Sequence, residues 1–362
     1  MRFLTYAPIS FMILAFALGP PFAWHVSQSN GASDFSWQDQ SIRALMNGQT
    51  ADTLEELYEA ELPINAFSVG AMNALSIGVF GEAREGAVIG NNGWLFTDEE
   101  FTWNANSEAN IAANLRLVED LHRRIADKGV SLSIVLLPQK ITIATEHIPA
   151  QLVPDIRAAM YDTILAGLRQ IEGLAVVDVR KAMLEVGGDE ELFLKTDTHW
   201  TRRGAEVSAH AIAASFLAAH DIQQTEFDRT ERAPVDHRGD LYAFMELSVF
   251  APLIAQPTDQ ITQLVVNPRS EAGSFLATDA ESAPEIGLVG TSYSADPLWS
   301  FAAHLQLALG APVVSFAEQG KGPFLPMIEF LEEDLTDQST TKHLIWEIPV
   351  RYFDKPVDLE TR

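Results

Sequence analysis

The sequence contains no cysteine among its 362 residues. This absence excludes thiol nucleophiles, disulfide frameworks and every zinc or iron–sulfur site that is built on cysteine. Basic residues are scarce as well, since 24 Lys and Arg stand against 50 Asp and Glu and give a formal net charge of −26. Nucleic-acid binding needs a clustered excess of Lys and Arg, so this balance excludes a nucleic-acid partner. Any nucleophile of this protein must therefore be an oxygen or an amine.

The remaining composition is that of a globular protein with a large core. Hydrophobic residues make up 47% of the chain and charged residues 20%, which excludes disorder and coiled-coil architecture as the main organisation. At about 150 residues per domain, the length allows two domains or one α/β domain with an insertion.

The N-terminal residues 1–26 are predicted to be an export signal or signal-anchor. Arg2 precedes a continuous apolar run over 11–18, a typical pattern for such segments. Prolines interrupt the segment near both ends, and no convincing small-x-small cleavage site follows it, so we expect an uncleaved membrane anchor with the rest of the chain outside the cytoplasm. Residues 27–50 are polar and suit a tether.

Strands and helices are predicted to alternate through most of the chain. Apolar spacing predicts helices over 52–58, 71–80, 107–128, 154–172, 202–219 and 297–309, and apolar runs predict strands over 130–137, 174–179, 285–290 and 343–348. Such alternation predicts an α/β fold with a parallel sheet flanked by helices. Residues 87–96 are predicted to form a hairpin that turns at Asn-Asn-Gly. Residues 221–284 break the alternation and are interpreted as an insertion of loops and short strands in a domain over 51–355, with 356–362 as a tail.

Two segments of the predicted sheet carry residues suited to catalysis, because catalytic groups in such sheets lie where strands end and helices begin. Asp197 and His199 belong to a loop directly before a helix that Thr201 can cap. Ser292 follows the strand over 285–290 and precedes Asp296-Pro297, a pair typical of a helix start. A serine nucleophile needs a base, and that base needs a group to orient it. The three residues supply one side chain for each role.

Each part has a plainer interpretation when it is taken alone. Gly-Thr-Ser is often only a turn, and an Asp-x-His pair is usually a solvated loop. The pair can also supply two metal ligands, but the next histidine on the following helix is His210, eleven residues away, so we expect no metal.

An ordered set of short motifs resembles the bacterial alginate O-acetyltransferase family of the AlgJ and AlgX type. The set covers roughly residues 50–355 and consists of Gly90-Asn-Asn-Gly-Trp-Leu-Phe96, Leu137-Pro-Gln-Lys140, Thr196-Asp-Thr-His-Trp-Thr201, Gly239-Asp-Leu241, Gly290-Thr-Ser-Tyr-Ser294 and Trp346-Glu-Ile-Pro-Val-Arg351. The resemblance implies an SGNH-hydrolase-like fold in which the Asp-x-His pair precedes the nucleophile. It also implies that Asp197, His199 and Ser292 form the triad.

The resemblance further implies a reaction and its partners. Acetyl groups, delivered by a membrane-bound acyltransferase, are transferred to hydroxyls of an exopolysaccharide on the periplasmic side of the inner membrane, through an acetyl-Ser292 intermediate and without a cofactor. No carbohydrate-binding module is expected after Arg351, so the chain resembles the membrane-tethered members. A chain this acidic repels a polyanion at long range, so polysaccharide acetylation is expected as a class rather than alginate in particular.

Further residues are candidates for oxyanion or substrate contacts. The backbone N–H of Ser292 and the segment Gly320-Lys-Gly322 are candidate oxyanion donors, with Gly290 beside the nucleophile. Other side chains are candidates for contacts with sugar rings or with an anionic sugar: Lys140, Arg202, Arg203, Arg351, Trp94, Trp200 and Tyr293.

Two other functions remain compatible with the sequence. An acetyl esterase uses the same acyl-enzyme, with water as the acceptor in place of a sugar hydroxyl. A non-catalytic periplasmic scaffold that binds polysaccharide does not need the three residues that the sequence offers.

Overall fold

The structure is a computed structural model, and it describes residues 41, 43, 63–80, 83, 86–149, 152, 155–186, 190–254, 257–269, 284–336 and 339–357. The predicted anchor and first helix lie outside the described residues, as do all but residues 41 and 43 of the tether and all but residues 356 and 357 of the tail. Within the described part, no helix is both long enough and apolar enough to cross a bilayer.

The chain divides into two compact units, residues 1–81 with 246–255 and residues 82–245 with 256–362. The first unit contains the helix α4 (Pro63–Leu75), the π-helical turn η2 (Ser76–Phe80) and the 3-10 segment η8 (Ser248–Leu253). α4 packs on η8, and a side chain at Gly70 would lie only 2.7 Å from the carbonyl oxygen of Leu247. The predicted helix over 71–80 thus begins earlier, at Pro63.

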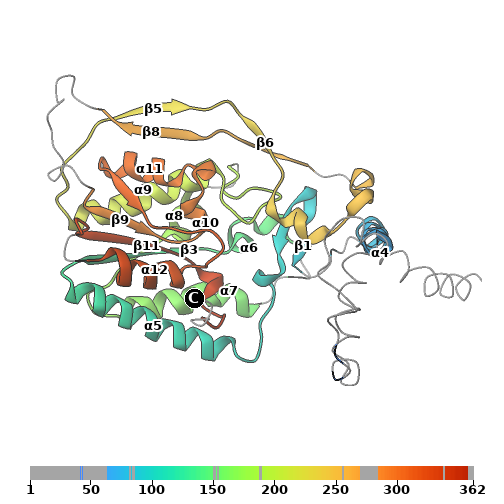
Figure 1. Ribbon diagram of the computed structural model, residues 1–362, viewed down its shortest axis with the longest axis horizontal. Helices are drawn as coiled ribbons and strands as arrows, with labels where there is room; N and C mark the ends of the chain where they lie inside the picture. The colour runs from blue at the N-terminus through green and yellow to red at the C-terminus, as the bar shows by residue number, and fades with distance from the viewer. Residues whose placement is uncertain are drawn as a thin grey trace, which may run out of the picture. The chain divides into compact units, whose positions relative to one another are not determined.

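The second unit is built around a five-stranded parallel sheet in the order β10-β9-β11-β3-β4 (Figure 1). Its strands are β3 (Ser131–Leu137), β4 (Ala175–Asp178), β9 (Ile286–Val289), β10 (Val313–Ser315) and β11 (His343–Pro349). The four predicted strands are all present, and the expected parallel sheet is confirmed. The short edge strand β10 was not predicted.

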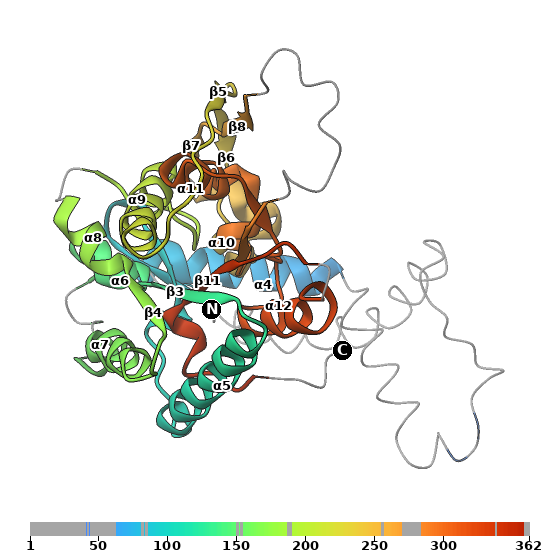
Figure 2. The same cartoon turned by 90° about the vertical axis from the view of Figure 1, so that its left-hand side faces the viewer.

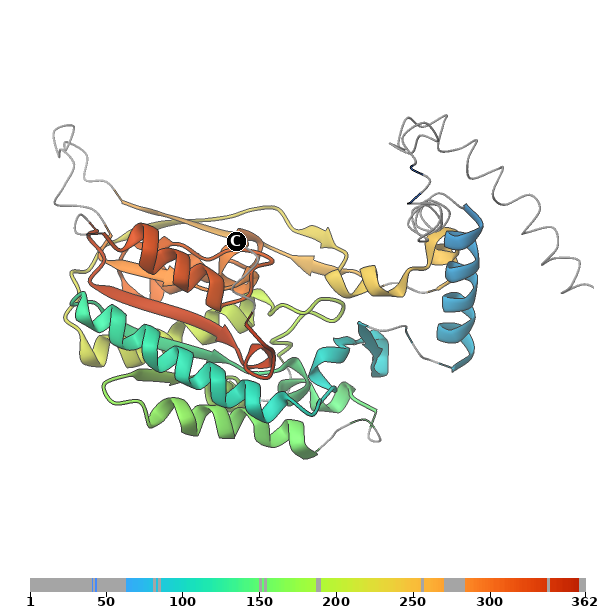
Figure 3. The ribbon, with the colours of Figure 1, turned by 60° about the horizontal axis from the view of Figure 1, so that its bottom comes forward.

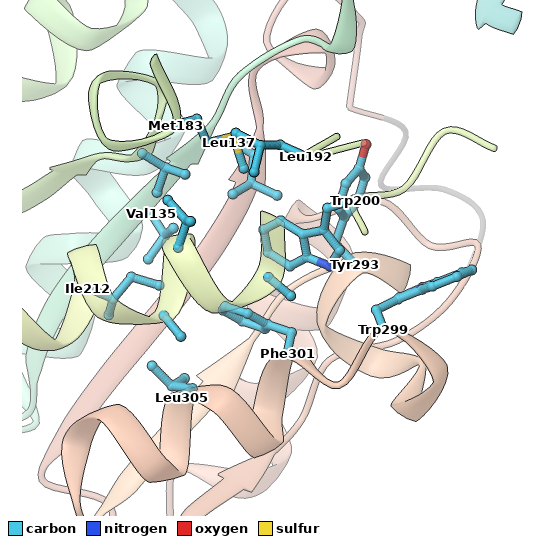
Figure 4. Packing of buried hydrophobic residues seen from close by; sticks show 14 of the residues in the cluster. Val135, Leu137, Met183, Leu192, Trp200, Ile212, Tyr293, Trp299, Phe301 and Leu305 are labelled. Atoms are coloured by element: carbon cyan, nitrogen blue, oxygen red, sulfur yellow. The ribbon is translucent and has the colours of Figure 1, made fainter. Parts of the chain in front are cut away.

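Helices cover both faces of this sheet (Figure 2). One face carries α5 (Ser107–Asp127), α7 (Asp155–Arg169) and α12 (Phe324–Glu329), and the other carries α8 (Val179–Val186), α9 (Arg202–Ala219) and α11 (Phe301–Leu309). The side chains of β3 alternate between two cores, with Ile134 and Leu136 facing the first group of helices and Val135 and Leu137 the second. Figure 4 shows the second core around Val135, Ile212 and Leu305.

The predicted helix over 297–309 is in fact two elements. Asp296 accepts a hydrogen bond from Leu298 N at 2.9 Å and starts the 3-10 turn η9 (Pro297–Trp299). Ser300 then adopts a left-handed backbone, with φ 61°, before α11 begins at Phe301. The chain therefore turns sharply after Trp299, and this turn sets the direction of the Trp299 side chain.

Two-stranded antiparallel pairs supply the remaining strands. β1 (Ala87–Ile89) pairs with β2 (Leu95–Thr97), which confirms the predicted hairpin. The predicted insertion contains β5 (Phe227–Glu231) paired with β8 (Leu264–Pro268), β6 (Val235–His237) paired with β7 (Asp259–Ile261), and the 3-10 segment η7 (Asp240–Met245). β8 packs against α11, and Figure 3 shows the long β5–β8 ribbon in yellow and orange.

Candidate functional site

The loop before α9 holds Asp197 and His199 in place through its own backbone. Phe193 and Trp200 form an isolated antiparallel bridge, and the carbonyl of His199 accepts a hydrogen bond from Leu194 N at 3.0 Å. Thr201 caps α9 by accepting from Gly204 N at 3.1 Å, as predicted. This loop, named the catalytic loop for its candidate role, is therefore closed at its base, and it carries the side chains of Asp197 and His199.

The turn after β9 carries Ser292. Thr291 caps the short helix α10 (Ser292–Ala295) by accepting a hydrogen bond from Tyr293 N at 3.3 Å. Gly290 permits a close approach here, since a Cβ at this position would lie 2.5 Å from Glu347 Oε2. Only glycine fits between the nucleophile turn and β11 without a shift of one of them.

The structure brings Ser292, His199 and Asp197 together in one hydrogen-bonded line. The Oγ of Ser292 lies 2.7 Å from His199 Nε2, and His199 Nδ1 lies 2.6 Å from Asp197 Oδ1. Asp197 is buried and His199 is 8% exposed. One imidazole thus bridges an alcohol and a carboxylate that are 95 residues apart in the sequence.

Electrostatics fix the direction of these hydrogen bonds. Burial favours the neutral form of Asp197, but hydrogen bonds from His199 and His237 outweigh burial and hold the pKa of this carboxyl well below its usual range. An ionised Asp197 only accepts, so His199 Nδ1 carries the proton and donates. The Nε2 atom of neutral His199 is then free to accept the hydroxyl proton of Ser292.

Two aromatic rings enclose the imidazole of His199. The Trp299 ring stacks on it, with centroids 4.7 Å apart and an interplanar angle of 17°, and the Tyr293 ring lies 4.6 Å away at 49°. Figure 4 shows Tyr293 and Trp299 close together with Trp200 and Phe301. Because the rings restrict rotation of the imidazole, His199 stays aligned with both hydrogen-bond partners.

The insertion supplies residues to the site that the sequence analysis missed. His237 Nε2 and the backbone N–H of Asp240 both donate to Asp197 Oδ2, at 2.7 and 3.0 Å. The carboxylate of Asp240 accepts from Thr198 N and Thr198 Oγ1 at 2.8 and 2.5 Å. Burial and the charge of Asp197 raise the pKa of Asp240. The only sequence signal for this region was the motif Gly239-Asp-Leu241.

Gly239 lets the backbone of the insertion pass in direct contact with the backbone of the catalytic loop. A Cβ at Gly239 would lie 1.9 Å from the carbonyl oxygen of Thr196. Asp259 binds the same loop through Lys195 N and through Thr196 N and Oγ1, at 3.0, 3.2 and 2.7 Å. Two segments of the insertion therefore fasten the loop that carries Asp197.

The ligand atoms of Asp197, His199 and Asp240 lie within 4.8 Å of one another, a spacing that also suits a cation. Each of these atoms already has a hydrogen-bond partner within the protein. A cation at this position would have to replace those hydrogen bonds.

Lys140 lies beneath the catalytic loop and is 2% exposed. Its ammonium donates to the carbonyl oxygens of Leu95, Lys195 and Asp197 at 2.6, 3.1 and 2.9 Å. Burial lowers its pKa to about 8. Buried Glu100 accepts from Lys140 N at 3.0 Å. The prediction that Lys140 faces a sugar does not agree with this position, because all three donors of the ammonium point to backbone oxygens.

Arg351 and Tyr293 are also buried, at 8% and 1% exposure. The guanidinium of Arg351 donates to the hydroxyl of Tyr293 at 3.2 Å and lies 3.4 Å from a carboxylate oxygen of Glu99. The hydroxyl of Tyr293 in turn donates to the carbonyl of Thr198. These two side chains connect the nucleophile turn to the catalytic loop, in place of the predicted contacts with substrate.

The other predicted substrate contacts are also engaged within the protein. Arg202 pairs with Glu231, and Arg203 pairs with Glu190 and Glu206. The rings of Trp94 and Trp200 lie in the core, at 2% and 0% exposure. The two rings are therefore not available to a sugar, whereas the side chains of Arg202 and Arg203 remain 32% and 42% exposed beside their carboxylate partners.

Gly320 and Gly322 belong to the loop that follows β10. Both have positive φ, 79° and 67°, which explains the glycines without a role in catalysis. The loop begins beside the nucleophile turn, since Glu318 N donates to the carbonyl oxygen of Gly290 at 3.1 Å. Within the described part of the chain, neither glycine forms a hydrogen bond with Ser292.

The fold and the site together define an SGNH-hydrolase-like α/β protein in which an Asp-x-His loop precedes the serine. A family model described as "SGNH hydrolase-like domain, acetyltransferase AlgX" matches residues 87–350. The chain belongs to this family.

Individual relatives agree with this assignment. A protein of Azotobacter vinelandii named probable alginate O-acetylase AlgJ is 35% identical over 337 residues, which cover 91% of this chain and 85% of that protein. The O-acetyltransferase domain of Pseudomonas putida AlgJ superimposes with a TM-score of 0.68 at 30% identity, over 76% of this chain and 95% of that domain. Pseudomonas aeruginosa AlgX shares the fold, with a TM-score of 0.59 at 21% identity over 75% of this chain and 63% of that one.

Proposed function

We propose that this protein is an O-acetyltransferase that moves acetyl groups to hydroxyls of an alginate-like exopolysaccharide. The observation that carries the proposal is the position of His199, which bridges Ser292 Oγ at 2.7 Å and Asp197 Oδ1 at 2.6 Å. The relatives named as alginate O-acetylases support the reaction and the kind of acceptor.

The first half of the reaction forms an acetyl-enzyme. His199 Nε2 takes the hydroxyl proton of Ser292 while Oγ attacks the acetyl carbonyl of the donor ester. The tetrahedral intermediate collapses when the C–O bond to the leaving alcohol breaks, and His199 returns the proton to that alcohol. Ionised Asp197 stabilises the imidazolium that exists between these two proton transfers.

The second half transfers the acetyl group to the polysaccharide. A sugar hydroxyl takes the position of the departed alcohol, gives its proton to His199 and attacks the acetyl carbon. The bond to Ser292 Oγ breaks, and the serine recovers its proton from the imidazolium. The backbone N–H of Ser292 is our candidate donor to the oxyanion, a role for which one preorganised donor contributes about 3 kcal/mol.

The N-terminal sequence supports a location outside the cytoplasm, anchored to the inner membrane with the catalytic domain in the periplasm. Acetyl groups must then reach Ser292 from the membrane side. We propose a membrane-bound acyltransferase as their source, in keeping with the family that the chain belongs to.

The experiment compares wild type with Ser292→Ala, using an activated acetyl ester as the donor. Because the net charge of −26 opposes the approach of a polyanion, both uronate and neutral oligosaccharides serve as acceptors. Mass spectrometry should show acetylated sugar with wild type and none with the variant. Acetate release without sugar modification would identify an esterase, and equal behaviour of both proteins would identify a non-catalytic scaffold.

A further inference from the structure

A second histidine shares the carboxylate of Asp197. His237, the final residue of β6, places its Nε2 atom 2.7 Å from Asp197 Oδ2, while His199 holds Oδ1. Asp240 N donates to the same Oδ2 at 3.0 Å, and His199 N donates to Oδ1 at 2.9 Å. Asp197 thus lies between two imidazoles, and each of its oxygens receives two hydrogen bonds.

A carboxylate that is held by only one oxygen can turn about its terminal torsion, which has broad energy minima. Such a turn would move the acceptor away from His199 Nδ1 and release the orientation of the ring. The side chain of His237, together with the backbone N–H of Asp240, opposes this movement by holding the other oxygen, and the His237 contact is the shorter of the two. The backbone crossing at Gly239, where a side chain would lie 1.9 Å from Thr196 O, keeps the segment that carries His237 against the catalytic loop.

The surroundings of His237 favour its charged form. Three carboxylates act on it, those of Asp197, Asp259 and Asp240, and the hydrogen bond to Asp197 is the largest cause of a raised pKa. The Trp299 ring meets the imidazole edge-on, with centroids 5.3 Å apart at 85°. The other imidazole on Asp197 is that of His199, whose charge changes during the proposed reaction.

We propose that His237 is a positioning residue for acetyl transfer: it holds the second oxygen of Asp197 so that the first stays directed at His199, and its charge tunes how readily His199 takes the proton of Ser292. A protonated His237 offsets part of the negative charge of Asp197 and repels a proton on His199. The proposal rests on the proposed function, because it assigns His199 the role of the base.

The test compares His237→Ala and His237→Gln with wild type. A glutamine amide nitrogen can occupy nearly the position of imidazole Nε2, so it keeps the hydrogen bond but not the charge. His210→Gln is the matched control, since His210 is exposed on α9. Two rates are measured from pH 5 to 9: hydrolysis of an activated acetyl ester, resolved into kcat and KM, and labelling of Ser292 by a sulfonyl fluoride. Thermal melting identifies a temperature at which every variant is folded.

Loss of one hydrogen bond to a charged group should reduce kcat and the labelling rate of His237→Ala by about 10- to 100-fold, with little change in KM. Glutamine should restore both rates to within about threefold of wild type. Its acid limb should move to higher pH, because the positive charge beside Asp197 is gone and no longer offsets that carboxylate.

Equal rates for His237→Ala and wild type would overturn the proposal, as would a glutamine variant as slow as the alanine variant. An unmoved acid limb in His237→Gln would show that the charge of His237 does not act on His199, and would contradict it too. Ser292→Ala distinguishes failure of the proposed function from failure of the role of His237. If that variant keeps full activity, the proposed function itself is wrong; if it is inactive while His237→Ala is unaffected, only the role of His237 fails.

Discussion

Replacing Glu347 with alanine tests how the turn that carries Ser292 is held. Glu347 lies in β11 with no exposed surface. Its carboxyl accepts from Thr291 N at 2.8 Å, from Thr291 Oγ1 at 3.0 Å and from Ser294 Oγ at 3.0 Å. Thr291 and Ser294 flank Ser292 in the sequence, so the carboxyl of Glu347 holds the turn on both sides of the serine.

The expected loss of stability follows from the hydrogen-bond donors that Glu347→Ala leaves without an acceptor. A buried donor without a partner costs about 1–3 kcal/mol. The amide of Thr291 cannot turn to another acceptor, whereas the two hydroxyls can rotate. The loss of a buried acidic group offsets part of the cost, and we expect Glu347→Ala to lower the free energy of unfolding by about 3 kcal/mol. For a domain of this size that corresponds to a melting temperature lower by about 6–12 °C.

Glu347→Gln separates the hydrogen bonds from the charge. Burial raises the pKa of Glu347 above 4.5, its ordinary value. Between that value and the raised one, the folded protein keeps a proton that the unfolded chain releases, so the stability of wild type falls as the pH rises. Glutamine cannot titrate. The stability of Glu347→Gln relative to wild type should therefore increase with pH and become constant once the pH exceeds the raised pKa.

Thermal unfolding of wild type and both variants between pH 4 and 8 measures these effects. Subtracting the wild-type curve cancels the titration of all other groups. The proposed role of Glu347 is refuted if Glu347→Gln is destabilised as much as Glu347→Ala, or if the difference in stability between Glu347→Gln and wild type does not change with pH. Labelling of Ser292 by a sulfonyl fluoride should be slowed in the alanine variant and nearly unchanged in the glutamine variant.

Three further changes test other parts of the site. Trp299→Leu removes the ring stacked on His199 and should lower kcat by about 3- to 10-fold, whereas Trp299→Phe retains a ring and should keep most of the wild-type kcat. Equal kcat values for Trp299→Leu and wild type in steady-state kinetics would contradict this role. Lys140→Met removes the ammonium that donates to three carbonyl oxygens, of which that of Lys195 keeps the hydrogen bond from Leu95 N. The change should cost about 3 kcal/mol in denaturant unfolding, unlike a change at the exposed Lys181, and equal unfolding midpoints for Lys140→Met and wild type would refute this role. Gly239→Ala must displace the backbone at Thr196, so the rate of ester hydrolysis and the melting temperature should both fall. Wild-type values of both would show that the backbones at Gly239 and Thr196 are not in close contact.

Much of the sheet could be predicted because its signal is local. The apolar spacing over 107–128 matches α5, and the apolar runs over 130–137 and 343–348 match β3 and β11. Ser292, His199 and Asp197 could be predicted as a group because strand ends gather at one edge of a parallel sheet.

Other features carry no local signal. His237 lies 40 residues from Asp197, in an insertion whose short strands have no clear periodicity, so its contact with Asp197 depends on the tertiary structure. Ser300 breaks the predicted helix with a left-handed backbone that serine rarely adopts. Lys140 was predicted to contact an anionic sugar, and its burial beneath the loop has no local signal, because lysine is almost never fully buried unless it is paired. Glu347 did leave a signal, since it is an acidic residue within an otherwise apolar strand.

The order of the central sheet has a consequence for the growing chain. β11 follows every other strand of this sheet in the sequence, yet it lies in the middle, between β9 and β3. Until β11 is inserted, no strand joins the two halves of the sheet. One half is β9 and β10, of which β9 leads to Ser292, and the other half, β3 and β4, precedes the loop of His199. Ser292 can meet His199 only after contacts between strands that lie more than 200 residues apart, such as β11 and β3, have formed, which favours slow folding.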